Sequence, residues 1–227
     1  MSTGIEDEPA LNGIAPGCGS DFDPLYGEDA LAGTEAAEAD RARHKAYLRA
    51  MWSEPPSARR AVFVLGVCAV SGLLAVACAL FKGTVGAFVL SATVGAPVIE
   101  EMAKVALTLW ALEKSPWKFR SASEIVLACV ASAAVFAAIE NVLYIYVYIP
   151  KDRLTSGIIL YRLTVCTALH IVCTSITSVG LARGWREAKA RLGEFKKARA
   201  MPFLVAAMVL HGLHNAGAIL WSIGSKF

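Results

Sequence analysis

Five blocks of predominantly apolar residues, each 21 to 29 residues long, occupy most of this chain. A helix needs about 20 apolar residues to cross the hydrocarbon core of a bilayer, so each block is long enough to span a membrane. Hydrophobic residues make up 56% of the 227 residues and charged residues only 18%, which excludes an ordinary soluble domain. The sequence therefore predicts an all-α fold, a polytopic membrane bundle of about five transmembrane helices.

We expect the second block to form one helix and not two. Gly95, Ala96 and Pro97 interrupt it, but its 29 residues would give each of two passes far fewer than the roughly 20 residues that spanning requires. One long helix, tilted or kinked at this point, accommodates the interruption. The expected spans cover residues 61–81, 84–112, 123–149, 156–182 and 202–223.

Positive charge is distributed unevenly along the chain. With the N-terminus in the cytoplasm, sixteen Lys and Arg residues fall on the inner side of the membrane and four fall on the outer side. This asymmetry follows the positive-inside rule, and splitting the second block would spoil it. We therefore expect a multi-pass protein of the cell membrane with a cytoplasmic N-terminus and an external C-terminus. The net charge of +3 is too small to indicate binding to nucleic acid.

The chain before the first span forms a separate region, residues 1–58. Its first part, to about residue 40, is rich in Gly, Ala, Pro, Asp and Glu and lacks periodicity, which predicts a disordered acidic arm. From Glu38 to Trp52 the sequence becomes basic and helical, which predicts a juxtamembrane helix against anionic headgroups. No signal-peptide core occurs in this region, so we expect the first span to act as a signal anchor. Residues 59–227 are expected to form the transmembrane domain.

Strongly polar residues lie inside four of the five blocks. A charged side chain at the centre of a spanning helix costs roughly 2.5–3.5 kcal/mol, so such residues are expected to face the bundle interior and to satisfy one another. With a rise of about 1.5 Å per residue, Glu100, Glu140, His170 and His211 fall at similar depths near the middle of the bilayer. The sequence therefore predicts one shared site. The polar residues are Glu100, Glu101, Lys104, Glu140, Asn141, Arg162, His170, His211, His214 and Asn215.

Four motifs in these blocks carry a family resemblance. The run EEMAK fits the pattern E-E-x-x-K, FAAIEN fits F-x-x-x-E-N, and HGLHN fits H-x-x-x-N, with the isolated His170 between the last two. With the motifs in this order, the chain resembles the PrsW family of intramembrane proteases. That family is related to the CAAX-processing and bacteriocin-processing membrane proteases. The resemblance covers about residues 84–223 and makes the transmembrane domain protease-like.

The resemblance implies hydrolysis of a peptide bond inside the bilayer. Its substrate would be a single-span or membrane-anchored protein, for example an anti-sigma factor. Glu100, or its neighbour Glu101, would pair with His170 to activate water. His211 with Asn215 would stabilise the oxyanion.

The remaining motif residues have supporting roles in this interpretation. Glu140 would hold the histidines or the water, and Lys104 would balance carboxylate charge. His214 is a departure, since an aromatic or aliphatic residue is expected at its position. The catalytic candidates are Glu100, Glu101, Lys104, Glu140, Asn141, His170, His211 and Asn215.

The same side-chain types are zinc ligands, so a metalloprotease is the alternative to a glutamate protease. We expect no metal cofactor, for three reasons. No H-E-x-x-H run is present. The adjacent glutamates of EEMAK point about 100° apart on a helix, and the nearby lysine opposes a cation. If a divalent metal such as zinc binds, its predicted ligands are Glu140, His170, His211 and His214.

Two other classes of function place polar residues at the middle of a membrane. A proton- or ion-coupled carrier also needs Glu, Lys and His there, but such carriers usually contain repeats, and none is visible in this sequence. A non-catalytic membrane scaffold of the same fold would be expected to lack one of the motif residues, and here every one is present. The sequence does not predict an oligomeric state.

Overall fold

The computed structural model describes residues 35–53, 58–81 and 88–224 of the chain. Within these ranges the regular secondary structure consists of helices, without strands, which confirms the predicted all-α class. The chain divides into two compact units, Met1–Glu54 and Pro55–Phe227. In the first unit the described part is a single helix, α1 (Glu35–Ser53), which contains the predicted basic helix. The rest of the predicted acidic arm, residues 1–34, lies outside the described residues.

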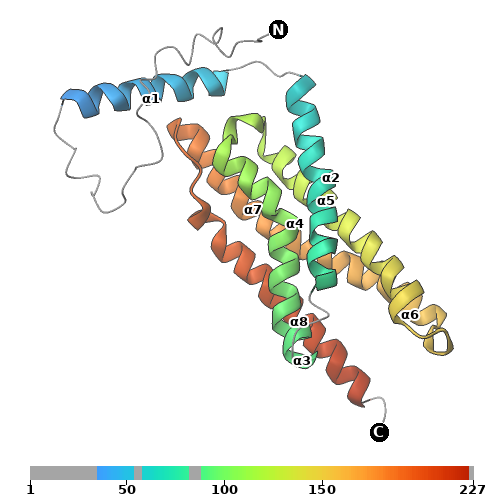
Figure 1. Ribbon diagram of the computed structural model, residues 1–227. Coiled ribbons are helices and arrows are strands. Elements are labelled where there is room, and N and C mark those ends of the chain that lie inside the picture. Colours follow the sequence, from blue (N-terminus) through green and yellow to red (C-terminus); the bar gives the residue numbers. More distant parts are fainter. Residues whose placement is uncertain (1–34, 54–57, 82–87, 225–227) are drawn as a thin grey trace. The chain divides into compact units, whose positions relative to one another are not determined.

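Five long helical segments make up the described part of the second unit (Figure 1). Three of them contain a π-helical turn, in which the helix is wider by about one residue per turn. In chain order the elements are α2 (Ala58–Phe81), α3 (Phe88–Leu90) with the π turn Ser91–Gly95 and α4 (Ala96–Lys114), α5 (Ala122–Leu143) with the π turn Tyr144–Tyr148, α6 (Ser156–Tyr161) with the π turn Arg162–Cys166 and α7 (Thr167–Arg191), and α8 (Met201–Gly224).

Three of these helices are long and apolar enough to cross a membrane: Ala122–Tyr148, Ser156–Arg191 and Met201–Trp221. The helix over residues 88–114 carries two glutamates and a lysine within its apolar stretch, which sets it apart from these three. The predicted count of about five spans is therefore supported for three helices, and membrane crossing by the other two stays a prediction. The helix that contains the fourth predicted span continues from residue 182 to Arg191, because the polar run after the apolar block is also helical.

The second apolar block is one continuous helix over residues 88–114. The interruption at Gly95, Ala96 and Pro97 falls where the π turn meets α4. Ala96 N–H donates to the Ser91 carbonyl, so the series of backbone hydrogen bonds continues through the π turn. Pro97 lies inside this continuous helix, directly after the π turn, and has no N–H to donate to the preceding turn.

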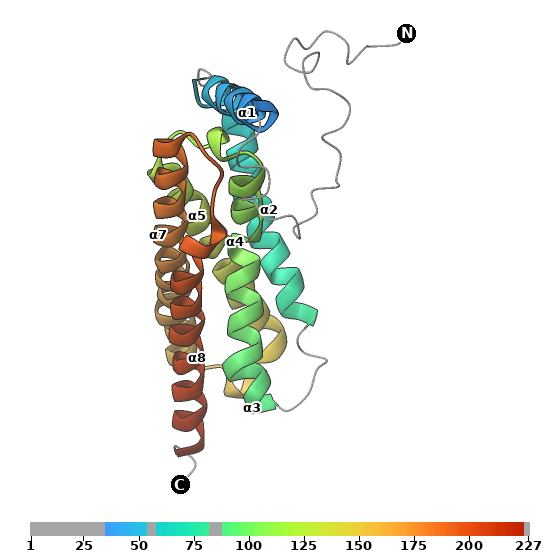
Figure 2. The ribbon, with the colours of Figure 1, turned by 90° about the vertical axis from the view of Figure 1, so that its left-hand side faces the viewer.

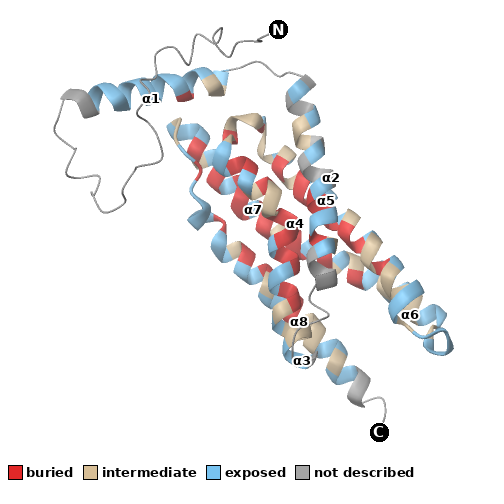
Figure 3. Ribbon diagram, viewed as in Figure 1, coloured by how far each residue is buried: buried red, intermediate tan, exposed pale blue. Residues whose placement is uncertain are grey.

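Helix α4 lies at the centre of the second unit, where it contacts α2, α5, α7 and α8 (Figures 1 and 2). Buried residues are concentrated on α4, α5 and α7 (Figure 3). Small residues bring the helices close together: a Cβ on Gly180 of α7 would collide with the Phe203 side chain of α8. Polar residues on α4 are therefore shielded by neighbouring helices.

Candidate active site

The central helix α4 buries an ion pair. Lys104 Nζ donates to Glu101 Oε1 at 2.7 Å, and neither side chain has exposed surface. The spacing of three residues places the two side chains on one face of the helix. Removing either partner would leave a buried charge without compensation, which is strongly destabilising. The spacing along the helix allows Lys104 to contact either Glu100 or Glu101, and in the structure it pairs with Glu101.

His170 of α7 extends this pair toward α5. Its Nδ1 lies 2.8 Å from Lys104 Nζ, and its Nε2 lies 2.9 Å from Glu140 Oε2. An ammonium group can only donate, so Nδ1 accepts from Lys104, and the proton on Nε2 is then donated to Glu140. Arg162 donates from its guanidinium to the same Glu140 oxygen at 2.9 Å. Glu140 thus contacts both His170 and Arg162, and its role in catalysis stays a prediction.

His211 of α8 meets α4 from the other side. Its Nδ1 lies 2.9 Å from Glu101 Oε1, so the ring donates a proton from this nitrogen to the carboxylate. Thr174 donates to the second oxygen of Glu101 at 3.3 Å. This tautomer turns the lone pair of His211 Nε2 toward Glu100, whose Oε2 is 3.7 Å away. A carboxylate that orients a histidine in this way is typical of the surroundings of metal ligands.

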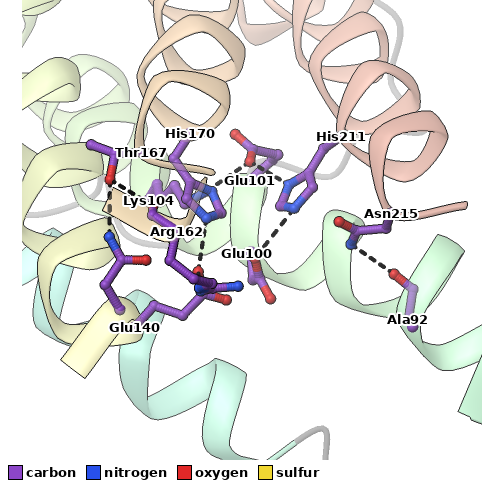
Figure 4. A network of polar contacts seen from close by, with 11 residues as sticks. Ala92, Glu100, Glu101, Lys104, Glu140, Arg162, Thr167, His170, His211 and Asn215 are labelled. Carbon is purple, nitrogen blue, oxygen red and sulfur yellow. Dashed lines mark hydrogen bonds and ion pairs between the residues drawn. The ribbon is translucent and has the colours of Figure 1, made fainter. Parts of the chain in front are cut away.

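These contacts form one network across α4, α5, α7 and α8 (Figure 4). The structure thereby brings together six of the eight candidate residues predicted from the sequence. They are Glu100, Glu101, Lys104, Glu140, His170 and His211.

The other two candidates, Asn141 and Asn215, are hydrogen-bonded to residues outside this network. Asn215 Nδ2 donates to the Ala92 carbonyl at 2.9 Å, and Figure 4 shows this contact at some distance from the Glu140 and His170 side chains. Asn141 Nδ2 donates to Thr167 Oγ1 at 2.9 Å. His211 and Asn215 were expected to stabilise the oxyanion together. In this structure His211 donates to Glu101 and Asn215 to the Ala92 carbonyl, and their role in catalysis stays a prediction.

A cavity of about 410 Å³ opens beside the network. Glu100, Glu140, His170 and His211 line it together with Arg162. The other lining residues are Ser91, Ala92, Ala96, Tyr144, Tyr161, Cys166, Leu169, His214, Asn215, Ala218 and Ile219. The acid–base groups of the network therefore border one open cavity.

Arg162 was not among the candidates chosen from the sequence. The sequence feature that could have identified Arg162 is a spacing of four residues. Arg162, Cys166 and His170 follow one another at this interval, and all three line the cavity. The π turns that border the cavity have no recognisable sequence signal.

Glu100, His170 and His211 form a candidate donor set for a divalent metal, in which His170 Nε2 binds the metal only after it loses the proton that it donates to Glu140. One donor atom of each residue lies within 4.8 Å of the others, and all three residues are buried. Two zinc bonds of about 2 Å at a tetrahedral angle span about 3.3 Å, close to the 3.7 Å between His211 Nε2 and Glu100 Oε2. This set differs from the predicted metal ligands. It replaces Glu140 by Glu100 and omits His214, whose Nε2 lies 2.9 Å from the Tyr161 hydroxyl.

These features define the chain as a helical membrane protein with a buried, cavity-facing Glu–His cluster. Residues 54–227 match the family described as PrsW family intramembrane metalloprotease. The match covers more than half of the chain, so the chain belongs to the PrsW family, and the resemblance noted in its motifs is confirmed. Comparisons with curated proteins and with solved structures gave no match.

Proposed function

We propose that this protein hydrolyses a peptide bond of a membrane-anchored protein inside the bilayer. One observation carries the proposal: Glu100, Glu140, His170 and His211 reach a single cavity from four helices. Hydrolysis of an amide needs a base for water, an acid for the leaving nitrogen and donors for the oxyanion, and this cluster contains groups of each kind. Membership of the PrsW family supports proteolysis in the membrane.

We further propose that a divalent metal, zinc by its ligand chemistry, is held by Glu100, His170 and His211. Bound there, it would act as a Lewis acid and lower the pKa of water. One of the three sequence arguments against a metal was the positive charge of Lys104. In the structure that charge is matched by Glu101, and Glu101 is not among the three donors.

The chain's own residues would then divide the work. Glu140 accepts a proton from the attacking water and later gives it to the leaving nitrogen. Glu101 holds His211 through Nδ1, which fixes the direction of Nε2. Lys104 neutralises Glu101 and contacts His170 Nδ1, so it fixes the second histidine. In the metal-free alternative, Glu100 is the base that activates water.

The membrane arrangement proposed with this function has five spans, a cytoplasmic N-terminus and an external C-terminus. The substrate class is a single-span or membrane-anchored protein, for which the resemblance gives an anti-sigma factor as an example. The cavity lies among the helices, which suits a substrate that already resides in the bilayer.

The test uses the full-length protein purified in detergent and a panel of single-span peptides. Glu100→Gln, Glu140→Gln, His170→Ala and His211→Ala should each lower cleavage by roughly 10² to 10⁴. Glu187→Gln is the matched control, because Glu187 pairs with Arg199 at the surface. Full activity in Glu100→Gln would refute the assigned site.

Metal analysis separates the two forms of hydrolysis. A metalloprotease should carry about one equivalent of zinc, lose both zinc and activity to a membrane-permeant chelator, and bind less zinc after His170→Ala or His211→Ala. Full activity of the metal-depleted protein would leave the glutamate mechanism in place.

A further inference from the structure

Arg162 is a partly buried arginine at the wall of the cavity. It begins the π turn Arg162–Cys166 between α6 and α7, and 13% of its side chain is exposed. Its guanidinium donates to Glu140 Oε2 at 2.9 Å and stacks on the Tyr144 ring, with 3.6 Å from the guanidinium carbon to the ring centroid. Charged residues inside membrane helices are costly and mark functional sites by default.

The guanidinium has donors beyond those that Glu140 requires. Arg162 Nε is buried and has no hydrogen-bond partner in the described part of the chain. Buried donors are normally satisfied, and an exception calls for an explanation such as an absent ligand. Arg162 lines the same cavity as the donor set Glu100, His170 and His211. An acceptor oxygen that entered this cavity would therefore lie beside the Arg162 side chain.

The oxyanion role was expected of residues that line the cavity but have other hydrogen-bond partners in this structure. The resemblance assigned it to His211 with Asn215, but Asn215 donates to the Ala92 carbonyl and His211 is held between two glutamates. An arginine is a strong donor for an oxygen that gains negative charge.

We propose that Arg162 binds the carbonyl oxygen of the scissile peptide bond and stabilises the oxyanion. The proposal rests on the proposed function and adds a catalytic residue to it. It also explains why an arginine is present, since Lys would form the ion pair with Glu140 but lacks the second set of donors.

Charge remains balanced around Arg162 throughout the reaction. The oxygen of water forms a bond to the carbonyl carbon, the C=O π pair moves to the carbonyl oxygen, and one water proton goes to Glu140. The negative charge thus passes from Glu140 to the oxyanion, and both lie beside the same guanidinium. When the C–N bond breaks, the proton moves from Glu140 to the nitrogen and the charge returns to Glu140.

The experiment compares Arg162→Lys and Arg162→Gln with the wild type on the peptide that the wild type cleaves fastest. Both variants should lose roughly 10² to 10³ in kcat with little change in KM, because the interaction forms only as charge develops. Zinc content should stay at the wild-type level. Arg153→Gln is the control, since Arg153 is exposed and outside the cavity. Added guanidinium or ethylguanidinium ions should restore part of the activity of Arg162→Ala.

A role as a mere anchor for Glu140 makes a different prediction. An anchor adds nothing once Glu140 is gone, so Arg162→Gln should then leave the residual activity of Glu140→Gln unchanged. The oxyanion role requires a further loss in that double variant. A kcat within about threefold of wild type in Arg162→Gln, beside an inactive Glu140→Gln, would overturn the proposal and leave the proposed function intact. A wild type that cleaves no peptide, with or without zinc, would defeat the proposed function itself.

Discussion

Gly212 of α8 provides a way to move one half of the site without touching its chemistry. It follows His211 and lies against the backbone of Thr93 in the π turn Ser91–Gly95. A Cβ at this position would penetrate about 1 Å inside ordinary van der Waals contact with the Thr93 carbonyl oxygen. The obstacle is backbone, so Gly212→Ala has to shift α8 away from the turn.

The geometry gives the size of the effect. A shift of about 1 Å would lengthen the 2.9 Å contact between His211 Nδ1 and Glu101 Oε1 beyond hydrogen-bonding distance. A misplacement of about 1 Å in a catalytic group costs on the order of 10² in rate. We expect Gly212→Ala to lose about 10² in kcat and about 10- to 100-fold in zinc affinity.

The control lies five residues further along the same helix. Gly217 has nothing within 4 Å of a built Cβ, so Gly217→Ala should keep wild-type cleavage and zinc content. Peptide cleavage and zinc titration of both purified variants decide the matter. Wild-type kcat and zinc affinity in Gly212→Ala would show that the close approach of α8 to the π turn does not position His211.

Three further predictions follow from the same structure. Lys104→Met should lower the free energy of unfolding by about 3–5 kcal/mol, because it leaves the Glu101 carboxylate buried and uncompensated. The double variant with Glu101→Gln should regain much of the melting temperature but not the activity. Trp185→Phe should cost about 1–3 kcal/mol in thermal unfolding, because it removes the 2.8 Å hydrogen bond to the buried Pro116 carbonyl, and should leave kcat of the folded protein unchanged. A label attached at Phe227 should react only from outside the cell, and reaction only from the cytoplasm would contradict five spans.

Helix boundaries and the convergence of polar residues were within reach of the sequence. The cost of a charge in lipid requires Glu100, Glu140, His170 and His211 to face the bundle interior, and similar depth brings them to one place. The structure joins all four through one cavity. The single helix over residues 88–114 also followed from length alone, because half of the block is too short to span.

The pairing within the site was beyond sequence reasoning. Lys104 lies four residues from Glu100 and three from Glu101, and both spacings allow contact along a helix. The choice of Glu101 depends on which neighbouring helix each carboxylate faces: Glu101 meets Thr174 and His211. Asn215 is a similar case, since its partner is a backbone carbonyl of a π turn, which no side-chain pattern reveals.

The three π turns explain why the contacts within the site were not predicted from the sequence, and they also shape the cavity. Each of the three turns contributes lining residues: Ala92, Tyr144 and Arg162 are examples. An extra residue in a turn rotates the following part of the helix by about 100° relative to an ideal helix. A helical-wheel projection that starts at one end therefore assigns the residues beyond the turn to the wrong face. Irregular backbone at membrane depth is tolerated only where protein or a water-filled cavity satisfies it. Asn215 on the Ala92 carbonyl meets that condition, which ties the polar edge of the cavity to the packing of α8.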